Sequence, residues 1–190
     1  MRTVLLLIGL VGVLAGCGDA PPPRDDFVLP EGARPIGPGA RFHPPLREGP
    51  VPGCRPGPLG ERFGVHLELF GADRVVLFAA GIGTRPPRER HAGRISGARC
   101  FGPLVTIDPT GLVLLRPGTR ATVGDVFDLW GQPLAARRAA SFRGTVRAYV
   151  NGERHRGPVR DIPLGRHDQI VLQVGPYVPP HAAYTFPEPY

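Results

Sequence analysis

The side chains able to do chemistry in this chain are six histidines, sixteen carboxylates, three cysteines and two serines. No two histidines stand two or four positions apart, so the sequence holds no local metal-chelating pair. Neither Ser96 nor Ser141 lies in a Gly-x-Ser-x-Gly turn. No lysine occurs, which excludes a Ser-x-x-Lys nucleophile, a phosphate-loop lysine and a Schiff base. No catalytic residue is predicted, and these patterns give no support to an enzyme.

The N-terminus combines a charge, an apolar run and a cysteine. Arg2 precedes an apolar stretch from Val4 to Leu14, which is typical of a secretory signal. It is shorter than the roughly 20 residues that span a bilayer. Leu14-Ala15-Gly16-Cys17 resembles the lipobox of bacterial lipoproteins. The resemblance implies a signal peptide at residues 1–16, lipid on Cys17, and a chain anchored in the cell membrane and facing outside the cytoplasm. An ordinary secreted protein is the alternative.

The other two cysteines, Cys54 and Cys100, are predicted to form a disulfide, because exported proteins fold in an oxidising compartment. Such a bond closes a loop of about 47 residues and stabilises the fold by roughly 4 kcal/mol in the chain-entropy model. The alternative is a metal site with two thiolate ligands. It lacks the Cys-x-x-Cys spacing that such sites use.

Composition divides the rest of the chain into three parts. Residues 17–58 are predicted to be a Pro-rich linker that begins at the lipidated Cys17 and acts as a spacer. Residues 59–178 are predicted to form a β-rich globular domain. Residues 179–190 are a tail of prolines and aromatic residues, either extended on the domain or loose. The 27 glycines and 25 prolines disfavour long helices and favour short strands and turns.

The periodicity predicts a mainly β fold, a compact antiparallel domain of about six to eight short strands. In the first strand, alternation places Val65, Leu67 and Leu69 on one face and the intervening residues, including His66, on the other. Turn sequences predict hairpins at 65–79, at 104–115 and around Asn151-Gly152. A further strand is expected at 169–174, a short one at 161–164, and residues 84–97 are predicted to be a basic loop.

One short amphipathic helix is predicted near 123–130. Thr122 can cap its N-terminus, with Asp125 in the capping-box position. Positions i, i+3, i+4 and i+7 form a single apolar face, made of Val123, Val126, Phe127 and Trp130. Gly131 and Pro133 end the helix. We therefore expect the two aromatic side chains to belong to the core.

Several segments between residues 63 and 188 carry a resemblance: residues 65–70, 80–83, 149–152 and 162–172, and most specifically the Phe-Asp-Leu-Trp-Gly-Gln-Pro-Leu run at 127–134. They resemble a family of exported bacterial proteins of unknown function. Its members carry a set of histidines, which implies a copper or zinc site. Here Gly64, Val105, Ile107 and Leu114 stand at four of those histidine positions. The resemblance leaves three candidate metal ligands, His66, Asp108 and His167.

We expect a membrane-anchored lipoprotein that serves as a non-enzymatic binding or interaction module and contacts a protein of the cell envelope. The second hypothesis is an exported metal-binding protein that uses copper or zinc. The third is a basic protein that holds anionic wall polymers through arginine. The net charge is +7, but the arginines are scattered, so no nucleic-acid partner is expected. No cofactor is expected apart from that metal.

Overall fold

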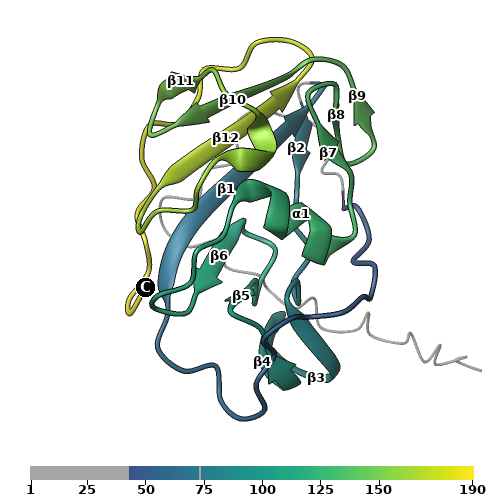
Figure 1. Ribbon diagram of the computed structural model, residues 1–190, viewed down its shortest axis with the longest axis vertical. Helices are drawn as coiled ribbons and strands as arrows, with labels where there is room; N and C mark the ends of the chain where they lie inside the picture. The colour runs from purple at the N-terminus through teal and green to yellow at the C-terminus, as the bar shows by residue number, and fades with distance from the viewer. Residues whose placement is uncertain (1–42, 73) are drawn as a thin grey trace, which may run out of the picture.

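A computed structural model describes residues 43–72 and 74–190 of the chain. The predicted signal peptide, Cys17 and the first part of the predicted linker lie outside the described residues. The fold is mainly β with one α-helix, as the periodicity predicts (Figure 1). Within the described ranges, no helix has both the length and the apolar character needed to cross a bilayer.

The main sheet has seven strands in the order β11-β10-β12-β1-β6-β5, with β2 paired to the C-terminal part of β1. Their bounds are Phe63–Gly71 for β1, Arg74–Val76 for β2, Leu104–Val105 for β5, Leu112–Leu115 for β6, Val146–Val150 for β10, Glu153–His155 for β11 and Gln169–Val174 for β12. The predicted hairpins β1–β2, β5–β6 and β10–β11 are all formed. A 3₁₀ turn, Val159–Asp161, takes part of the short strand expected at 161–164.

One pairing departs from the antiparallel arrangement that we predicted. β12 runs parallel to β1, whereas β6 and β2 run antiparallel to it. A parallel pair needs a long crossover, and nearly the whole domain separates these two strands in sequence. β1 therefore lies at the centre of the sheet, with the last strand of the chain beside it.

The two faces of β1 divide as the alternation predicts. Val65, Leu67 and Leu69 are buried on one face, where they join the main core with α1, Val123–Trp130 (Figure 1). His66, Glu68 and Phe70 point to the other face, where two smaller apolar clusters lie. Burial on both faces explains why almost the whole of β1 is inaccessible to solvent.

Helix α1 has the predicted ends. Thr122 accepts a hydrogen bond from the backbone of Asp125, and the Asp125 carboxylate accepts one from the backbone of Thr122. Gly131 ends the helix in the left-handed region at φ 70°. Phe127 and Trp130 are fully buried and contact Phe78 at centroid distances of 6.0 and 4.8 Å, so both aromatic side chains belong to the core as expected.

The prediction of a loop at 84–97 is wrong. β3, Thr84–His91, and β4, Arg94–Phe101, form an antiparallel hairpin (Figure 1). Most of its side chains are exposed, so the apolar alternation that marks a half-buried strand is missing from the sequence. A second small sheet follows α1 and consists of β7, Leu134–Ala135, β8, Arg138–Ala139, and β9, Phe142–Arg143.

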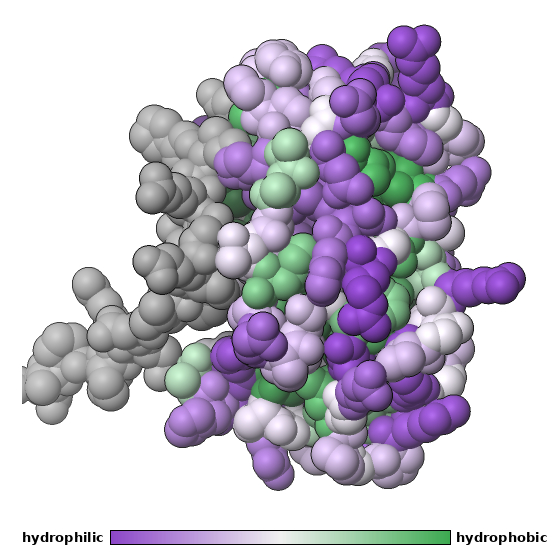
Figure 2. Space-filling model, turned by 90° about the vertical axis from the view of Figure 1, so that its left-hand side faces the viewer, coloured by the Kyte–Doolittle hydropathy of each residue, from purple (hydrophilic) through white to green (hydrophobic). Residues whose placement is uncertain are grey.

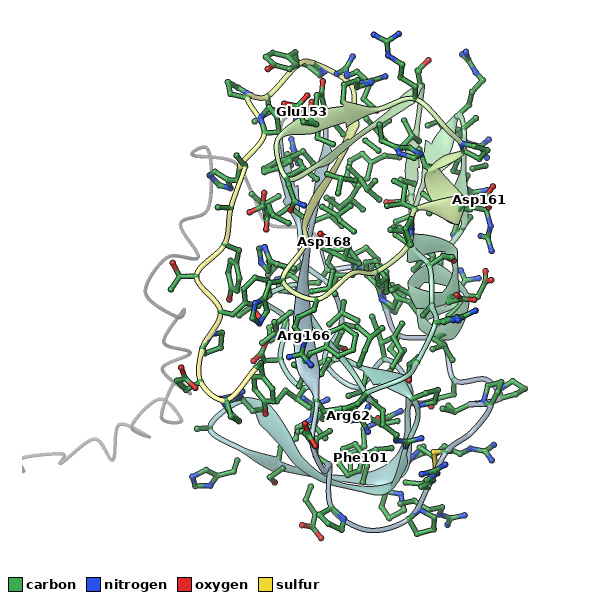
Figure 3. All side chains as sticks on the ribbon, turned by 60° about the vertical axis from the view of Figure 1, so that its left-hand side comes forward. Arg62, Phe101, Glu153, Asp161, Arg166 and Asp168 are labelled. Carbon is green, nitrogen blue, oxygen red and sulfur yellow. A yellow bond between two sulfur atoms is a disulfide. The ribbon has the colours of Figure 1, made fainter. Side chains whose placement is uncertain are left out.

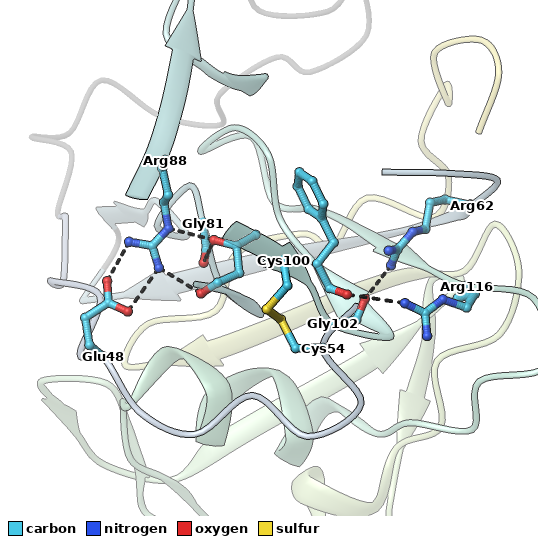
Figure 4. The surroundings of a disulfide bond; sticks show 10 residues. Glu48, Cys54, Arg62, Gly81, Arg88, Cys100, Gly102 and Arg116 are labelled. Carbon is cyan, nitrogen blue, oxygen red and sulfur yellow. Dashed lines mark hydrogen bonds and ion pairs between the residues drawn. A yellow bond between two sulfur atoms is a disulfide. The ribbon is translucent and has the colours of Figure 1, made fainter. Parts of the chain in front are cut away.

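Residues 43–58, which we predicted to belong to the linker, lie against the domain. The Arg47 backbone donates to Trp130 O at 3.1 Å, and Gln132 Nε2 donates to Pro45 O at 2.7 Å. Prolines still prevent a regular strand here, so the segment pairs with the domain only through isolated contacts, among them a β-bridge between Arg55 and Phe101. The predicted disulfide between Cys54 and Cys100 is present, with a Cα–Cα distance of 5.5 Å (Figure 4).

Two arginines brace the backbone next to the disulfide (Figure 4). Arg62, only 4% exposed, donates from Nη1 to Gly102 O at 2.9 Å and from Nε to Leu59 O at 3.1 Å. Arg116 donates to Phe101 O at 3.3 Å. Burial lowers the pKa of Arg62 to about 10, which leaves it charged at neutral pH.

Candidate functional site

His66 lies in the middle of β1, in a row across the sheet with Leu112 of β6 and Gln169 of β12. Its ring is buried, and both nitrogens have protein partners. Nδ1 lies 2.7 Å from Gln169 Oε1, and Nε2 lies 3.0 Å from Thr110 O. Burial lowers the pKa of His66, although the Glu68 carboxylate and both hydrogen bonds act in the opposite direction. A neutral ring donates from Nε2 to Thr110 O, and its Nδ1 is then an acceptor, which requires the Gln169 amide to turn its NH2 group toward the ring.

The other two candidate ligands also have protein partners. The buried carboxylate of Asp108 accepts hydrogen bonds from the backbone and hydroxyl of Thr110, and it forms an ion pair with Arg94 at 3.4 Å. These contacts close the turn between β5 and β6. His167 precedes β12 in the left-handed region, at φ 63°, and its ring stacks on Phe186 with a centroid distance of 4.7 Å.

The predicted metal ligands are therefore not brought together as a metal site. In the described part of the chain, no group of three or more histidine, cysteine, aspartate or glutamate side chains is arranged to hold a metal ion. His66 in addition directs both nitrogens at protein groups, which leaves no lone pair free for a cation. The scaffold positions these residues for hydrogen bonding and ring stacking.

The structure instead brings the C-terminal tail, residues 179–190, onto His66 and His167. The Tyr184 ring stacks on the His66 ring, with centroids 3.7 Å apart and an interplanar angle of 9°. The Phe186 ring stacks on the ring of His167, which stays exposed. Figure 3 shows the tail running beside the domain, from the end where Glu153 lies toward the end where Arg62 lies. The sequence left open whether this tail is docked or loose. The spacing of Tyr184 and Phe186, two positions apart, favours docking, because both rings of an extended chain then point to the same side.

The surface beneath the tail, which we call the tail seat, consists of His66, Glu68, Leu112 and His167. Gly64 leaves the space for it, since a Cβ there would lie 2.7 Å from Phe186 Cδ1 and 3.0 Å from Leu112 Cδ1. The aromatic side chains of the tail extend the apolar cluster that contains Leu112. On this side of the molecule, patches of apolar and hydrophilic residues alternate (Figure 2).

The charges around the seat differ along its length. The Glu68 carboxylate favours a positively charged group at one end, and burial favours the neutral form of the Tyr184 ring in the middle. His181 Nδ1 lies 2.9 and 3.0 Å from the two carboxylate oxygens of Glu68. Burial raises the pKa of Tyr184 to about 12, with further contributions from Asp108 and Glu68. The Tyr184 hydroxyl is buried without a hydrogen-bond partner.

The β3–β4 hairpin forms a second candidate surface, which we call the basic arm. It carries five arginines and one glutamate, a net charge of +4 over residues 84–101. Arg88 forms an ion pair with Glu48, whose pKa it lowers through their hydrogen bond. Arg85 and Arg99 are exposed and line a hollow of about 530 Å³, together with Glu48, Gly49, Pro50 and Pro86.

Comparison of the chain with protein-family models, with curated proteins and with solved structures gives no match. The interpretation of the two surfaces therefore depends on their own chemistry. Neither surface carries a nucleophile–base pair. The tail seat is built to hold aromatic side chains and a cation, and the basic arm is built to attract anions.

Proposed function

We propose that this chain is a lipid-anchored binding module of the bacterial cell envelope. The lipobox-like residues 14–17 support the anchor, and the prolines that follow Cys17 support a spacer between the membrane and the domain. The disulfide between Cys54 and Cys100 supports folding outside the cytoplasm, because such bonds form and persist in oxidising compartments.

The tail seat is the observation that carries the binding function. It holds an extended segment through two ring stacks and a hydrogen bond between His181 and the Glu68 carboxylate, which are the contacts of a recognition surface. An envelope protein that presents similar side chains is the partner that this surface suits.

The anchor is tested by metabolic labelling with an alkyne fatty acid. The wild-type chain should be labelled and should partition into detergent, whereas Cys17→Ser should lose both properties. The Cys54→Ser/Cys100→Ser variant is the matched control, since it also replaces cysteine by serine but keeps Cys17. Labelling of Cys17→Ser would contradict the proposal.

The binding function is tested by crosslinking in intact cells. A photoreactive amino acid replaces Arg166, an exposed residue of the domain next to His167 of the seat, and in the control it replaces the exposed Ser141. A specific adduct from position 166 alone is expected. If neither position yields a specific adduct, the chain is not a protein-binding module.

The basic arm favours a second candidate function, the binding of phosphate-rich wall polymers. Its attraction is electrostatic, so binding should weaken as salt rises and screens the charges. Arg85→Gln/Arg90→Gln/Arg99→Gln should reduce cosedimentation with isolated cell walls at low salt. The control, Arg120→Gln/Arg137→Gln/Arg143→Gln, removes the same charge from exposed positions elsewhere. Equal loss in both variants would show a general charge effect and exclude a site on the arm.

A further inference from the structure

We infer that the tail seat is a peptide-binding groove, that the tail is its internal occupant, and that a partner segment of the same chemistry displaces the tail. This inference rests on the proposed binding function and names the kind of ligand that the site takes. Three features of the tail carry it: the side from which it makes contact, the way it is held, and the hydroxyl that it leaves unsatisfied.

The tail contacts the domain as an extended ligand does. Tyr184 and Phe186 are half-buried, while Thr185 between them is exposed. In an extended chain, residues two apart point to the same side. The two rings therefore enter the seat together and stack on two histidines, His66 and His167.

The tail is held by side chains. Among the described residues, the backbone–backbone hydrogen bonds of 179–190 comprise one bond inside the tail itself, from Tyr190 N to Pro187 O. Prolines at 179, 180, 187 and 189 remove donors that strand pairing would need. Segments with few backbone hydrogen bonds to the domain open at low free-energy cost, whereas β1 beneath is paired along both edges.

The fit between tail and seat leaves one polar group unsatisfied. The Tyr184 hydroxyl is buried and has no hydrogen-bond partner. Burial of an unpaired polar group costs free energy that a better-matched ligand recovers. A segment with an apolar aromatic ring at the position of Tyr184 therefore avoids a cost that the tail bears.

These contacts define the ligand. It is an extended segment of another protein with aromatic residues at i and i+2, matching Tyr184 and Phe186. A cationic residue stands three positions before the first ring, where His181 meets the Glu68 carboxylate. Proline is accepted around this motif because the seat does not pair with the ligand backbone.

The test uses the whole mature chain, with Cys17→Ser to remove the lipid and with Cys54 and Cys100 oxidised. The probe is a fluorescein-labelled peptide of residues 179–190, and its anisotropy reports binding. In the Tyr184→Ala/Phe186→Ala chain the seat is vacated, so the peptide should bind. The chain with an intact tail should bind the peptide roughly tenfold or more weakly, because only the fraction of molecules whose tail has left the seat can bind it. The same peptide with both rings replaced by alanine should not bind.

Three outcomes overturn the inference. One is no binding to a folded Tyr184→Ala/Phe186→Ala chain, with folding checked by Trp130 fluorescence. Another is equal binding to the chains with and without the tail rings, which puts the peptide elsewhere. The third is that the intact chain forms a dimer, seen by light scattering, which excess peptide dissociates. The ligand of the seat would then be the tail of a second copy of this chain.

Should the double variant fail to fold, His181→Ala replaces it. This change removes only the hydrogen bond to Glu68, so the tail should open more often and the peptide should bind more tightly than it binds to the intact chain. No gain in binding over the intact chain overturns the inference. The fatty-acid labelling of Cys17 and the crosslinking from position 166 do not depend on this assay, so the two proposals can fail separately.

Discussion

At the scale of single residues, the buried imidazole of His66 governs how the domain responds to acid. Burial lowers the pKa of His66 in the folded state, so the unfolded chain binds a proton at a higher pH than the folded chain does. Stability therefore rises with pH across the interval between the two pKa values and falls on acidification. Glu68 opposes this effect, and the nearby His181 adds to it.

We predict that the free energy of unfolding of the wild-type chain decreases between pH 7 and pH 5, and that His66→Gln shows a smaller decrease. Glutamine keeps a polar group next to Gln169 but cannot take up a proton. Urea titrations at several pH values measure the effect, with the exposed His91→Gln as control. An unchanged pH dependence in His66→Gln would show that other groups dominate.

At the scale of elements, helix α1 depends on its capping box. Thr122 and Asp125 satisfy each other's backbone donors at the N-terminus, and Phe127 and Trp130 depend on the helix for their place in the core. Loss of a threonine cap usually costs about 1 kcal/mol. We predict that Thr122→Ala lowers the free energy of unfolding by about that amount, while Thr145→Ala at an exposed position has little effect. Chemical denaturation measures both, and equal values would contradict the capping role.

The sequence was sufficient for the elements whose signals are local. The alternation in β1, the cap of α1 and the Asn151-Gly152 turn each follow from residues close together in the chain. The parallel β1–β12 pair has no such signal, because the two strands are far apart in the sequence and the residues of one do not specify the other as its partner. The basic arm was missed because its strands are solvent-exposed and show no apolar period.

The candidate site was predicted only in part, for a related reason. Alternation placed His66 on the second face of β1, but nothing local shows that Tyr184 stacks on it. The proposed ligand set assumed that His66, Asp108 and His167 face one another. Thr110 and Arg94 instead satisfy Asp108, and the exposed His167 stacks on Phe186. Contacts of this kind depend on the long-range topology.

At the scale of the whole molecule, the disulfide joins residues 43–58 to the basic arm across 46 positions of sequence. Closing a loop of that length restricts the unfolded chain by an amount worth roughly 4 kcal/mol in the chain-entropy model. We predict that Cys54→Ser/Cys100→Ser unfolds at a lower temperature than the oxidised wild type. Reductant should lower the wild-type transition toward that of the variant and leave the variant unchanged. A reductant-insensitive wild type would show that the bond contributes nothing.

The same bond determines how the molecule bears mechanical load. A pull that enters from the N-terminal side reaches Cys54 and passes through sulfur to Cys100, so the polypeptide between them lies inside a covalent ring and carries no tension. β1, β2 and β3 are in that ring, together with His66 and Glu68. Leu112 and His167 lie beyond it, on the loaded path. Tension along the chain would therefore act on one half of the tail seat and spare the other.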